Sequence, residues 1–343
     1  MGMLTVAVEL SKALVAGRDG DAITLLCSRE RPPALAGLDC EAVLAPYRHE
    51  VVLKARWLPM IETQVGADAI LYPYWPSPPR RRPGAPPAAV YVHDLAFRLR
   101  PAEVPWQQRL YMGTVMGQAL RSAGAVLVPS ETTRRDVLAA YPLPGLEGRV
   151  TVVAEGLSMP AALGDLPVGI EPGFILAVGT VEPRKNYSRL LAAYRRLRSK
   201  PQLVIAGRPG WAYGDTLQKI RAEPGVRFLG HVDEPTLAAL YQSASVLAFP
   251  SLYEGFGLPL LEAMAAGLPA LIGKSGALPE LADGAAVEVD PEDVESIAAG
   301  LEKLLSDPAL RKKLADAGRR RAAAFTWDKA AASTLEVLRR IGA

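Results

Sequence analysis

Two glutamates, Glu254 and Glu262, bracket a glycine-containing turn in the segment Ser251-Leu-Tyr-Glu-Gly-Phe-Gly-Leu-Pro-Leu-Leu-Glu262. The apolar run 246–250 before this turn predicts a short buried strand. Residues 260–266 after it are strong helix formers and predict a helix. The segment is therefore typical of a ligand site on a strand-to-helix loop.

The residues of this loop indicate which chemistry it serves. We expect Pro259 at the first helical position and Glu262 in the first turn, where unpaired backbone N–H groups favour anions. Gly255 and Gly257 allow a ligand to approach the backbone closely, so the loop amides are suited to a phosphate. Glu262 is suited to accept hydrogen bonds from two neighbouring hydroxyls, as on a ribose, with Glu254 nearer the reacting group. Taken alone, such a pair is more often a loop charge and a helix-dipole partner, so the assignment depends on the rest of the chain.

A second loop carries two adjacent cations. The run 174–179 predicts a buried strand, and residues 180–186 form the loop that opens the next helix, with Asn186 as the expected N-cap. Arg184 and Lys185 thus follow a strand at its carboxyl end, beside a helix N-terminus, where cations and free amides converge on a pyrophosphate. Two exposed basic residues in a loop are the alternative interpretation.

Histidine is a third candidate. Residues 88–92 predict a buried strand, which places His93 and Asp94 at its carboxyl end, where doubly wound sheets bind ligands. An imidazole at this place donates to a sugar hydroxyl or a phosphate, and Asp94 either orients it or caps a helix. A structural role for His93 is equally compatible with the sequence. His49, in a polar loop, and His231, which could lie near a nucleotide, are weaker candidates.

The order of the motifs resembles that of a known enzyme family. The loop 179–186, the segment Val226-Arg-Phe-Leu-Gly-His231 and residues 250–267 follow one another as in the retaining GT-B glycosyltransferases of family four, the glycosyl transferases group 1. The resemblance covers nearly the whole chain and is strongest over residues 173–281. It implies an α/β protein with the GT-B fold, in which two Rossmann-like doubly wound parallel-sheet domains face each other across a cleft.

The resemblance also implies roles for individual residues. Arg184 and Lys185 match the basic pair on the donor diphosphate, and Glu262 matches the glutamate that binds the donor ribose. Glu254 and His93 match residues beside the transferred sugar, so these two and the basic pair form the implied catalytic set. The implied nucleotide-sugar site further includes Gly179, Phe228, Leu229, Gly230, Gly255, Phe256, Gly257, Leu258 and Pro259.

The implied activity is the transfer of a mannosyl- or glucosyl-type hexosyl group from a nucleotide diphosphate sugar to an acceptor hydroxyl, with retention of anomeric configuration. The acceptor is a saccharide or a lipid-linked glycan, in surface polysaccharide or glycoconjugate assembly. No cofactor is expected, and no metal, because Asp19-Gly-Asp21 is typical of a turn rather than a metal motif. A nucleotide-sugar epimerase of the same fold and a catalytically inactive sugar-nucleotide-binding protein remain open alternatives, as does the choice between UDP and GDP.

Composition sets the wider limits. The 343 residues suffice for two domains, and a net charge of +3 with 22% charged residues carries no bulk signature of nucleic-acid binding. Cys27 and Cys40 make no disulfide framework, and no run of ~20 apolar residues predicts a membrane span. We therefore expect a cytoplasmic protein. The basic segments 54–57 and 79–83 leave open a peripheral association with the inner membrane face, although they are more often solvated loops.

Alternating apolar runs and helical segments predict mainly parallel sheets in both halves. The expected strands are 22–26, 42–44, 69–72, 88–92, 125–128 and 150–153 in the first half, and 174–178, 202–206, 226–229, 246–249, 269–272 and 286–289 in the second. Helices are expected at 4–16, 106–123, 131–141 (after the N-cap Ser130) and 327–341. We expect an acceptor-side domain at 1–165, a donor-binding domain at 166–325 and a terminal helix at 326–343 that crosses back to the first domain.

Two departures from the family pattern are visible. The family's first strand is apparently missing, unless it lies upstream or residues 1–8 serve as a strand. Glu155 stands where the family commonly has the asparagine of a Pro-Asn-Gly turn, and it could simply replace a structural residue. Candidates for acceptor contacts are the aromatic segment 72–75 and the pair 97–98, which could equally belong to the core.

Overall fold

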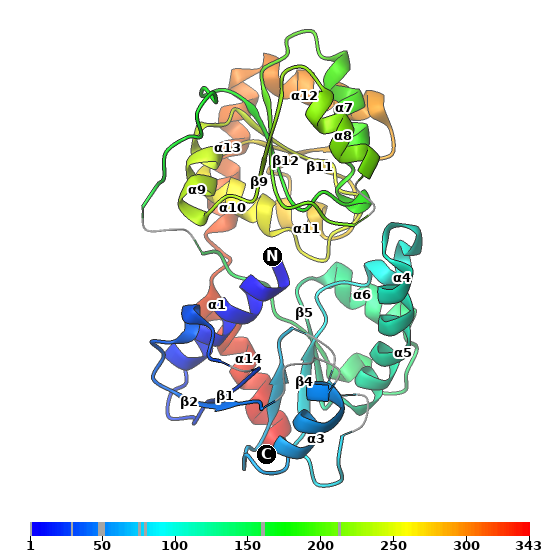
Figure 1. Cartoon of the computed structure of the whole chain (residues 1–343), viewed down its shortest axis with the longest axis vertical. Coiled ribbons are helices and arrows are strands. Elements are labelled where there is room, and N and C mark those ends of the chain that lie inside the picture. Colours follow the sequence, from blue (N-terminus) through cyan, green and yellow to red (C-terminus); the bar gives the residue numbers. More distant parts are fainter. Residues whose placement is uncertain are drawn as a thin grey trace. The chain divides into compact units, whose positions relative to one another are not determined.

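The computed structural model describes residues 2–28, 30–46, 52–74, 77–78, 81–158, 162–211 and 214–343. Its elements fall into two compact units, shown as ribbons in Figure 1. Unit 1 comprises Met1–Arg98, Trp106–Gly156 and Thr326–Ala343, and unit 2 comprises Leu99–Pro105 and Leu157–Phe325.

The strands of unit 1 are all parallel and form two sheets. A four-stranded sheet has the order β3-β4-β5-β6, and β1 pairs with β2 separately. Their bounds, each within two residues of the expected ones, are β1 Thr24–Cys27, β2 Glu41–Leu44, β3 Ile70–Tyr72, β4 Ala88–Tyr91, β5 Ala125–Val128 and β6 Val150–Val152. Every residue of β4 and β5 is buried, because these apolar strands have helices on both faces.

Helices cover both faces of the four-stranded sheet (Figure 1). Helix α14 packs against α1, β4 and β5, while α5 packs on β4 and α6 on β5 and β6. The side chain of Ser130 accepts a hydrogen bond from Thr133 N at 3.0 Å, which confirms it as an N-cap. The bounds are α1 Gly2–Ala16, η1 Pro33–Leu35, η2 Leu53–Trp57 (a π-turn), α3 Leu58–Ile61, α4 Ala96–Leu99, α5 Trp106–Ser122, α6 Glu131–Ala140, η4 Glu147–Arg149 and α14 Trp327–Gly342.

The first residues of the chain are helical. The interpretation of residues 1–8 as a strand is wrong, because α1 begins at Gly2. Val6, Leu10 and Leu14 are buried at helical spacing, so one face of α1 packs inward. No pairing joins β1–β2 to β3–β6 in the parts of the chain that the structure describes, and the absence of the family's first strand stays a prediction.

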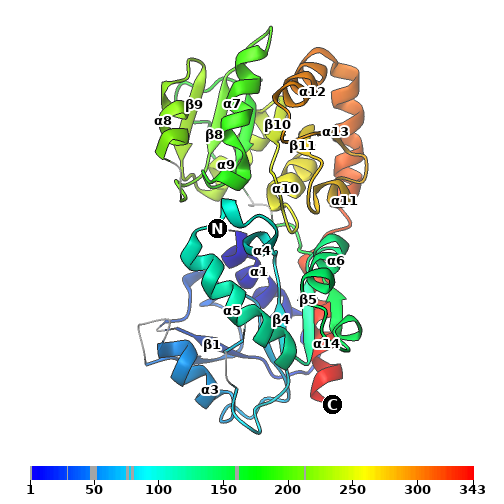
Figure 2. The same cartoon turned by 90° about the vertical axis from the view of Figure 1, so that its right-hand side faces the viewer.

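Unit 2 contains a six-stranded parallel sheet of order β12-β11-β10-β7-β8-β9. In Figures 1 and 2, α7, α8 and α12 lie together on one face, and α9, α10 and α13 on the other. The strands are β7 Ile175–Val178, β8 Leu203–Ala206, β9 Val226–Gly230, β10 Val246–Phe249, β11 Ala270–Gly273 and β12 Ala286–Val289. The helices are η3 Pro101–Glu103, η5 Pro183–Lys185, α7 Tyr187–Arg196, α8 Gly214–Ala222, α9 Glu234–Ser243, α10 Leu258–Ala266, α11 Leu278–Ala282, α12 Val294–Ser306 and α13 Pro308–Ala322.

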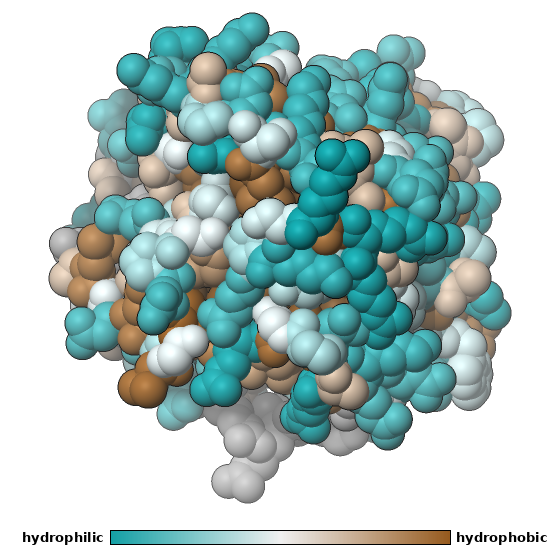
Figure 3. All heavy atoms as spheres, turned by 90° about the horizontal axis from the view of Figure 1, so that it is seen from above, coloured by the Kyte–Doolittle hydropathy of each residue, from teal (hydrophilic) through white to brown (hydrophobic). Residues whose placement is uncertain are grey.

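The basic segments 54–57 and 79–83, which leave a peripheral membrane association open, are described in part. Trp57 is only 3% exposed, so this aromatic residue belongs to the core rather than to a lipid-facing surface. Arg81 forms an ion pair of 2.8 Å with the buried Glu62, while residues 79–80 and the side chain of residue 54 lie outside the described part. As a separate observation, the face seen from above in Figure 3 is mainly hydrophilic, with hydrophobic residues scattered over it. None of the described helices is long and apolar enough to cross a membrane.

Candidate functional site

The strand order of unit 2 places two loops side by side. From β7 the chain continues to β8 on one side of the sheet centre, and from β10 it continues to β11 on the other. Neighbouring parallel strands whose connections leave in opposite directions form a crevice at their carboxyl ends, where doubly wound sheets bind ligands. Because β7 and β10 pair directly, the loops 179–186 and 250–257 both start at this crevice.

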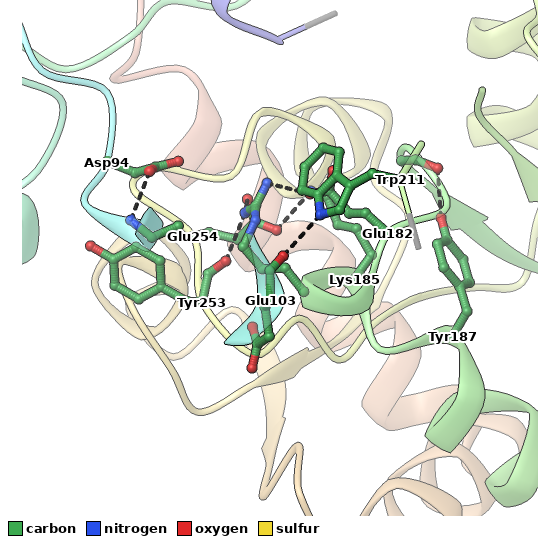
Figure 4. A network of polar contacts seen from close by, with 11 residues as sticks. Asp94, Glu103, Glu182, Lys185, Tyr187, Trp211, Tyr253 and Glu254 are labelled. Atoms are coloured by element: carbon green, nitrogen blue, oxygen red, sulfur yellow. Dashed lines mark hydrogen bonds and ion pairs between the residues drawn. The ribbon is translucent and has the colours of Figure 1, made fainter. Parts of the chain in front are cut away.

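Four charged side chains from these loops meet there. Arg184 Nη1 lies 2.7 Å from Glu254 Oε2, and Lys185 Nζ lies 2.7 Å from Glu254 Oε1. Arg184 Nη2 also contacts Glu182 Oε1 at 2.8 Å (Figure 4). We call Glu182, Arg184, Lys185 and Glu254 the charge cluster. The structure thus brings together Arg184, Lys185 and Glu254, and it adds Glu182.

The pKa values of the two carboxylates of the charge cluster shift in opposite directions. Burial by itself would raise the pKa of Glu254, but the charges of Arg184 and Lys185 outweigh it and lower the pKa to about 2. Glu254 is therefore ionised at neutral pH. Burial raises the pKa of Glu182, and the charge of Arg184 opposes this rise only in part. Glu254 is thus the main anion that holds the two cations in place.

A third loop, which follows β11, forms hydrogen bonds with the backbone of Glu254 and Ser251. Ala277 N donates to Glu254 O at 2.9 Å, and Ser275 Oγ donates to Ser251 O at 2.7 Å. At Gly276 the backbone has φ +56°, and a Cβ there would lie 2.4 Å from Glu254 O. Only glycine fits this close approach. The signal for this support in the sequence is Gly276, four residues after the expected strand 269–272.

Asn186 stands at the N-cap position of α7, as expected, and its side chain connects three loops. Its backbone is left-handed, with φ 62°, and its carbonyl accepts from Leu190 N at 3.1 Å, while its side chain makes no cap hydrogen bond. The left-handed backbone directs the amide to the neighbouring loops, where Nδ2 donates to Pro250 O at 3.0 Å and to Pro291 O at 2.6 Å. Asn186 therefore fixes the loop of Lys185 against the loop of Glu254.

Replacing Asn186 tests this tie. We expect Asn186→Ala to lower the free energy of unfolding by about 2–4 kcal/mol, because two buried carbonyls lose their donor and alanine disfavours positive φ. Asn186→Gly, which tolerates the backbone, should lose about 1–2 kcal/mol less, as chemical denaturation would measure. Equal losses in both variants would contradict a backbone contribution.

The side chain of Lys185 packs against the backbone of Gly179. A Cβ at Gly179, where φ is +144°, would lie 3.1 Å from Lys185 Cε. Tyr187 Oη donates to Gly179 O at 2.8 Å (Figure 4). Lys185 Nζ also lies 4.7 Å from the centre of the Phe249 ring. The small residue at 179 therefore leaves the room in which the lysine reaches Glu254.

Glu262 lies deeper in its helix than the sequence suggested. Helix α10 begins at Leu258, so Pro259 is its second residue and Glu262 its fifth, beyond the first turn. The expected first-turn position is therefore wrong by one residue. Tyr241 Oη donates to Glu262 Oε2 at 2.7 Å. Burial raises the pKa of Glu262 to about 7, although this hydrogen bond acts in the opposite direction.

The remaining predicted donor residues take several positions. Gly257 precedes α10 with φ 113°, and Gly255 stands between it and Glu254. Phe256 is buried and packs edge-on against Phe325 at 5.7 Å between ring centres, so its side chain serves the core. Phe228, Leu229 and Gly230 end β9, at the edge of the sheet, and are partly buried.

The segment Leu99–Pro105 contributes a further carboxylate to unit 2, that of Glu103. Trp211 Nε1 donates to Glu103 O at 3.0 Å (Figure 4). Glu103 Oε2 is buried and has no hydrogen-bond partner in the described residues. Burial raises the pKa of Glu103, opposed by the charges of Arg100 and then Arg184. No sequence motif indicates Glu103. Its segment, Leu99–Pro105, lies between two stretches of unit 1 in the sequence but packs with unit 2.

His93 belongs to unit 1 and is held on both ring nitrogens. Nε2 lies 2.8 Å from Pro73 O, and Nδ1 lies 3.3 Å from Glu155 Oε1. The Tyr91 ring lies 4.7 Å from it, centre to centre. Asp94 Oδ1 accepts a hydrogen bond from Ala96 N at 2.9 Å, so it caps the following turn.

The other candidates of unit 1 are core residues, the exposed Arg98, and residues outside the described part. Tyr72 is buried and donates to Glu62, and Phe97 is 5% exposed, so both belong to the core. The guanidinium of Arg98 lies 5.1 Å from the centre of the Tyr141 ring. Residue 75 and His49 lie outside the described residues.

His231 and the D-x-D segment are surface features. His231, in unit 2, is exposed beside Asp233, the N-cap of α9. Asp19 and Gly20 have positive φ, and Asp21 pairs with Arg339 at 2.7 Å, as expected for a turn.

Comparison with known proteins identifies the family. Residues 166–321 match the model of "Glycosyl transferases group 1", and residues 2–159 match that of "Glycosyltransferase Family 4". O-antigen chain mannosyltransferase B of Escherichia coli is 31% identical over 262 residues, which cover 72% of this chain and 69% of that protein. MMP alpha-(1->4)-mannosyltransferase of Mycolicibacterium hassiacum is 42% identical over 176 residues, which cover 48% of this chain and 42% of that protein.

Solved structures share the fold. Sucrose-phosphate synthase from Thermosynechococcus elongatus is 22% identical with a TM-score of 0.73, and the match covers 97% of this chain and 91% of that one. Anabaena HepE, solved in complex with UDP-glucose, is 17% identical with a TM-score of 0.74 and coverages of 98% and 96%. These matches confirm the predicted GT-B fold, and the chain belongs to the family 4, group 1 glycosyltransferases.

Proposed function

We propose that the protein is a metal-independent, retaining hexosyltransferase that uses a nucleotide diphosphate sugar as donor. The observation that carries the proposal is the charge cluster, in which Arg184 and Lys185 both contact Glu254 at the crevice between β7 and β10. The names of the two mannosyltransferase relatives favour a mannosyl group, and the UDP-glucose complex of HepE makes a glucosyl group the alternative.

In the proposed reaction the donor diphosphate replaces Glu254 as the anion bound by Arg184 and Lys185. Both cations then stabilise the negative charge that develops on the leaving diphosphate, while positive charge develops on the sugar. Glu254, ionised and released from the cations, accepts hydrogen bonds from hydroxyls of the transferred sugar. His93 is also proposed to contact the transferred sugar, because it matches the family's histidine beside that sugar. The acceptor is a saccharide or a lipid-linked glycan in polysaccharide or glycoconjugate assembly, and the proposed place of reaction is the cytoplasm.

A thermal-shift screen against GDP-mannose, UDP-glucose, an ADP-sugar and NAD tests the donor. We expect one nucleotide sugar to raise the melting temperature and Lys185→Met to remove the rise. Stabilisation by NAD alone would contradict the proposal. Conversion of the donor to an isomeric sugar without acceptor would favour an epimerase. Donor binding with no transfer to any acceptor would favour an inactive binding protein, and NMR of the product checks retention at the anomeric carbon.

Donor binding should depend on pH through Glu262. We propose that its carboxylate accepts from both ribose hydroxyls, whereas the protonated form keeps fewer acceptor sites. Since its pKa is about 7 in the folded protein, affinity for GDP or UDP should fall as the pH decreases below 7, approaching tenfold per pH unit.

Calorimetric titration from slightly alkaline to slightly acidic pH would measure this dependence. The variant Glu262→Gln should bind more weakly and lose the pH dependence, while Glu288→Gln, at an exposed position of β12, should retain it. A pH profile that Glu262→Gln leaves unchanged would remove Glu262 from the ribose site.

A further inference from the structure

Glu262 is a carboxylate with a single partner among the described residues. Tyr241 Oη donates to its Oε2 at 2.7 Å, and no cation and no second donor contacts it there. The other oxygen, Oε1, has no hydrogen-bond partner in this part of the chain and is accessible to solvent. A carboxylate has about four acceptor sites on its two oxygens. Most of the acceptor capacity of Glu262 is therefore left for a ligand.

Helix α9 supplies the groups that act on this carboxylate. Burial and then the charge of Glu234, an exposed residue of α9, raise the pKa of Glu262, while the hydroxyl of Tyr241 lowers it. Strands β10 and β11, which also pack on α10, contain no ionisable residue. Helices α11 and α13 contain several, including Glu280 and Arg319, but within the described residues none of them contacts Glu262. The Tyr241 hydroxyl is thus the neighbouring group that favours the ionised carboxylate.

Tyr241 is itself inside the protein, with 2% of its surface exposed. Burial, and then the charge of Glu262, raise the pKa of Tyr241 well above its usual value, so its hydroxyl keeps its proton and donates. Tyr194, a buried tyrosine of the same unit, donates to a backbone carbonyl instead, Pro201 O at 3.0 Å. A buried tyrosine of unit 2 therefore does not need a carboxylate as its acceptor. The pairing of Tyr241 with Glu262 is a specific arrangement between α9 and α10.

We propose that Tyr241 is a positioning residue for the donor ribose, which fixes Oε2 of Glu262 so that the carboxylate keeps one orientation toward the two ribose hydroxyls. The last torsion angle of a glutamate side chain has a broad distribution, so a carboxylate without this hydrogen bond rotates more freely. Since Tyr241 uses only one acceptor site, each ribose hydroxyl still finds an oxygen. This role rests on the proposed function, because it requires a ribose at Glu262.

The test compares a nucleoside diphosphate with its dideoxy analogue, which lacks both ribose hydroxyls. Calorimetric titration with the two compounds gives the preference of the protein for ribose. In Tyr241→Phe, which keeps the buried ring, we expect this preference to fall by about tenfold, the effect of losing one hydrogen bond to a charged group. Tyr194→Phe also loses a buried hydroxyl but should keep the preference. An unchanged preference in folded Tyr241→Phe would overturn the proposal.

A second comparison tests whether Tyr241 acts through Glu262. In a Glu262→Ala background, Tyr241→Phe should not change the preference for ribose any further, and a further loss of the same size would overturn the positioning role. The pH dependence gives a readout that a purely structural tyrosine would not move. Because Tyr241→Phe removes the donor that lowers the pKa of Glu262, the loss of affinity on acidification should begin at a higher pH. Tyr194→Phe should leave this profile unchanged.

Failure of the proposed function gives a different result. If the unaltered protein binds none of GDP, UDP and ADP, the proposed function fails, and the role of Tyr241 fails with it. If it binds one of them without a preference for ribose, the donor site at the charge cluster stands, but the positioning role of Tyr241 is overturned. Only the role of Tyr241 fails if the preference is present in the unaltered protein and unchanged in Tyr241→Phe.

Discussion

Glu254→Gln is expected to reduce glycosyl transfer by about 10²–10³-fold and, at the same time, to tighten the binding of inorganic pyrophosphate by about tenfold. Activity falls because the transferred sugar loses an ionised acceptor. Pyrophosphate binds more tightly because Glu254 occupies both Arg184 and Lys185 at 2.7 Å in the free protein and competes with any incoming anion. Calorimetric titration with pyrophosphate measures the second effect without a known donor. Weaker pyrophosphate binding in the variant would contradict this competition.

The same substitution should also destabilise the free protein. A pKa lowered from 4.5 to about 2 corresponds to about 3 kcal/mol of stabilisation, in the range for breaking a buried ion pair. A depressed carboxyl pKa stabilises the fold above the unfolded value and loses this contribution as the pH falls. The difference between Glu254→Gln and the unaltered protein should therefore shrink from pH 4.5 towards about 2. Glu288→Gln, exposed in the same unit, serves as the control.

Lys185→Met is expected to lower the rate of transfer by about 10²–10³-fold, because the leaving diphosphate loses one of two cations that are already in position. The neutral side chain is similar in length, so it still fits against Gly179, where a Cβ would come within 3.1 Å of Lys185 Cε. Steady-state kinetics with the donor found by thermal shift measure the effect. Lys219→Ala, at an exposed position of α8, should leave the rate unchanged.

The double variant Lys185→Met/Glu254→Gln separates pairing from catalysis. Lys185→Met removes one of the two cations that contact Glu254, and Glu254→Gln removes the anion that contacts Lys185. Both single variants lose the same ion pair, so the two losses of stability should be less than additive, by about 1–3 kcal/mol. Chemical denaturation of the four proteins gives this coupling. Strictly additive losses would show that the contact at 2.7 Å does not contribute to stability.

Local patterns were sufficient for the elements of the fold. Apolar runs such as 125–128 and 246–249 mark strands buried on both faces, and their alternation with helical segments predicts parallel sheets. Ser130 marks a helix start because its cap hydrogen bond reaches only three residues along the chain. The boundary of α10 was misjudged by one to two residues, since Leu258 can begin a helix as readily as the proline that follows it.

The sequence alone determined which residue types stand at the strand ends of unit 2, including Arg184, Lys185 and Glu254, because each motif follows directly from a strand. Only the tertiary structure decided their partners. Glu182 joins the cations, Asn186 bridges loops more than 60 residues apart, and Glu155 meets His93 across 62 residues of sequence. These contacts depend on strand order and on loop geometry that no local pattern encodes. The sequence shows which side chains are ionisable. Their pKa values and their partners depend on how deeply each is buried and on which groups the fold brings into contact with it.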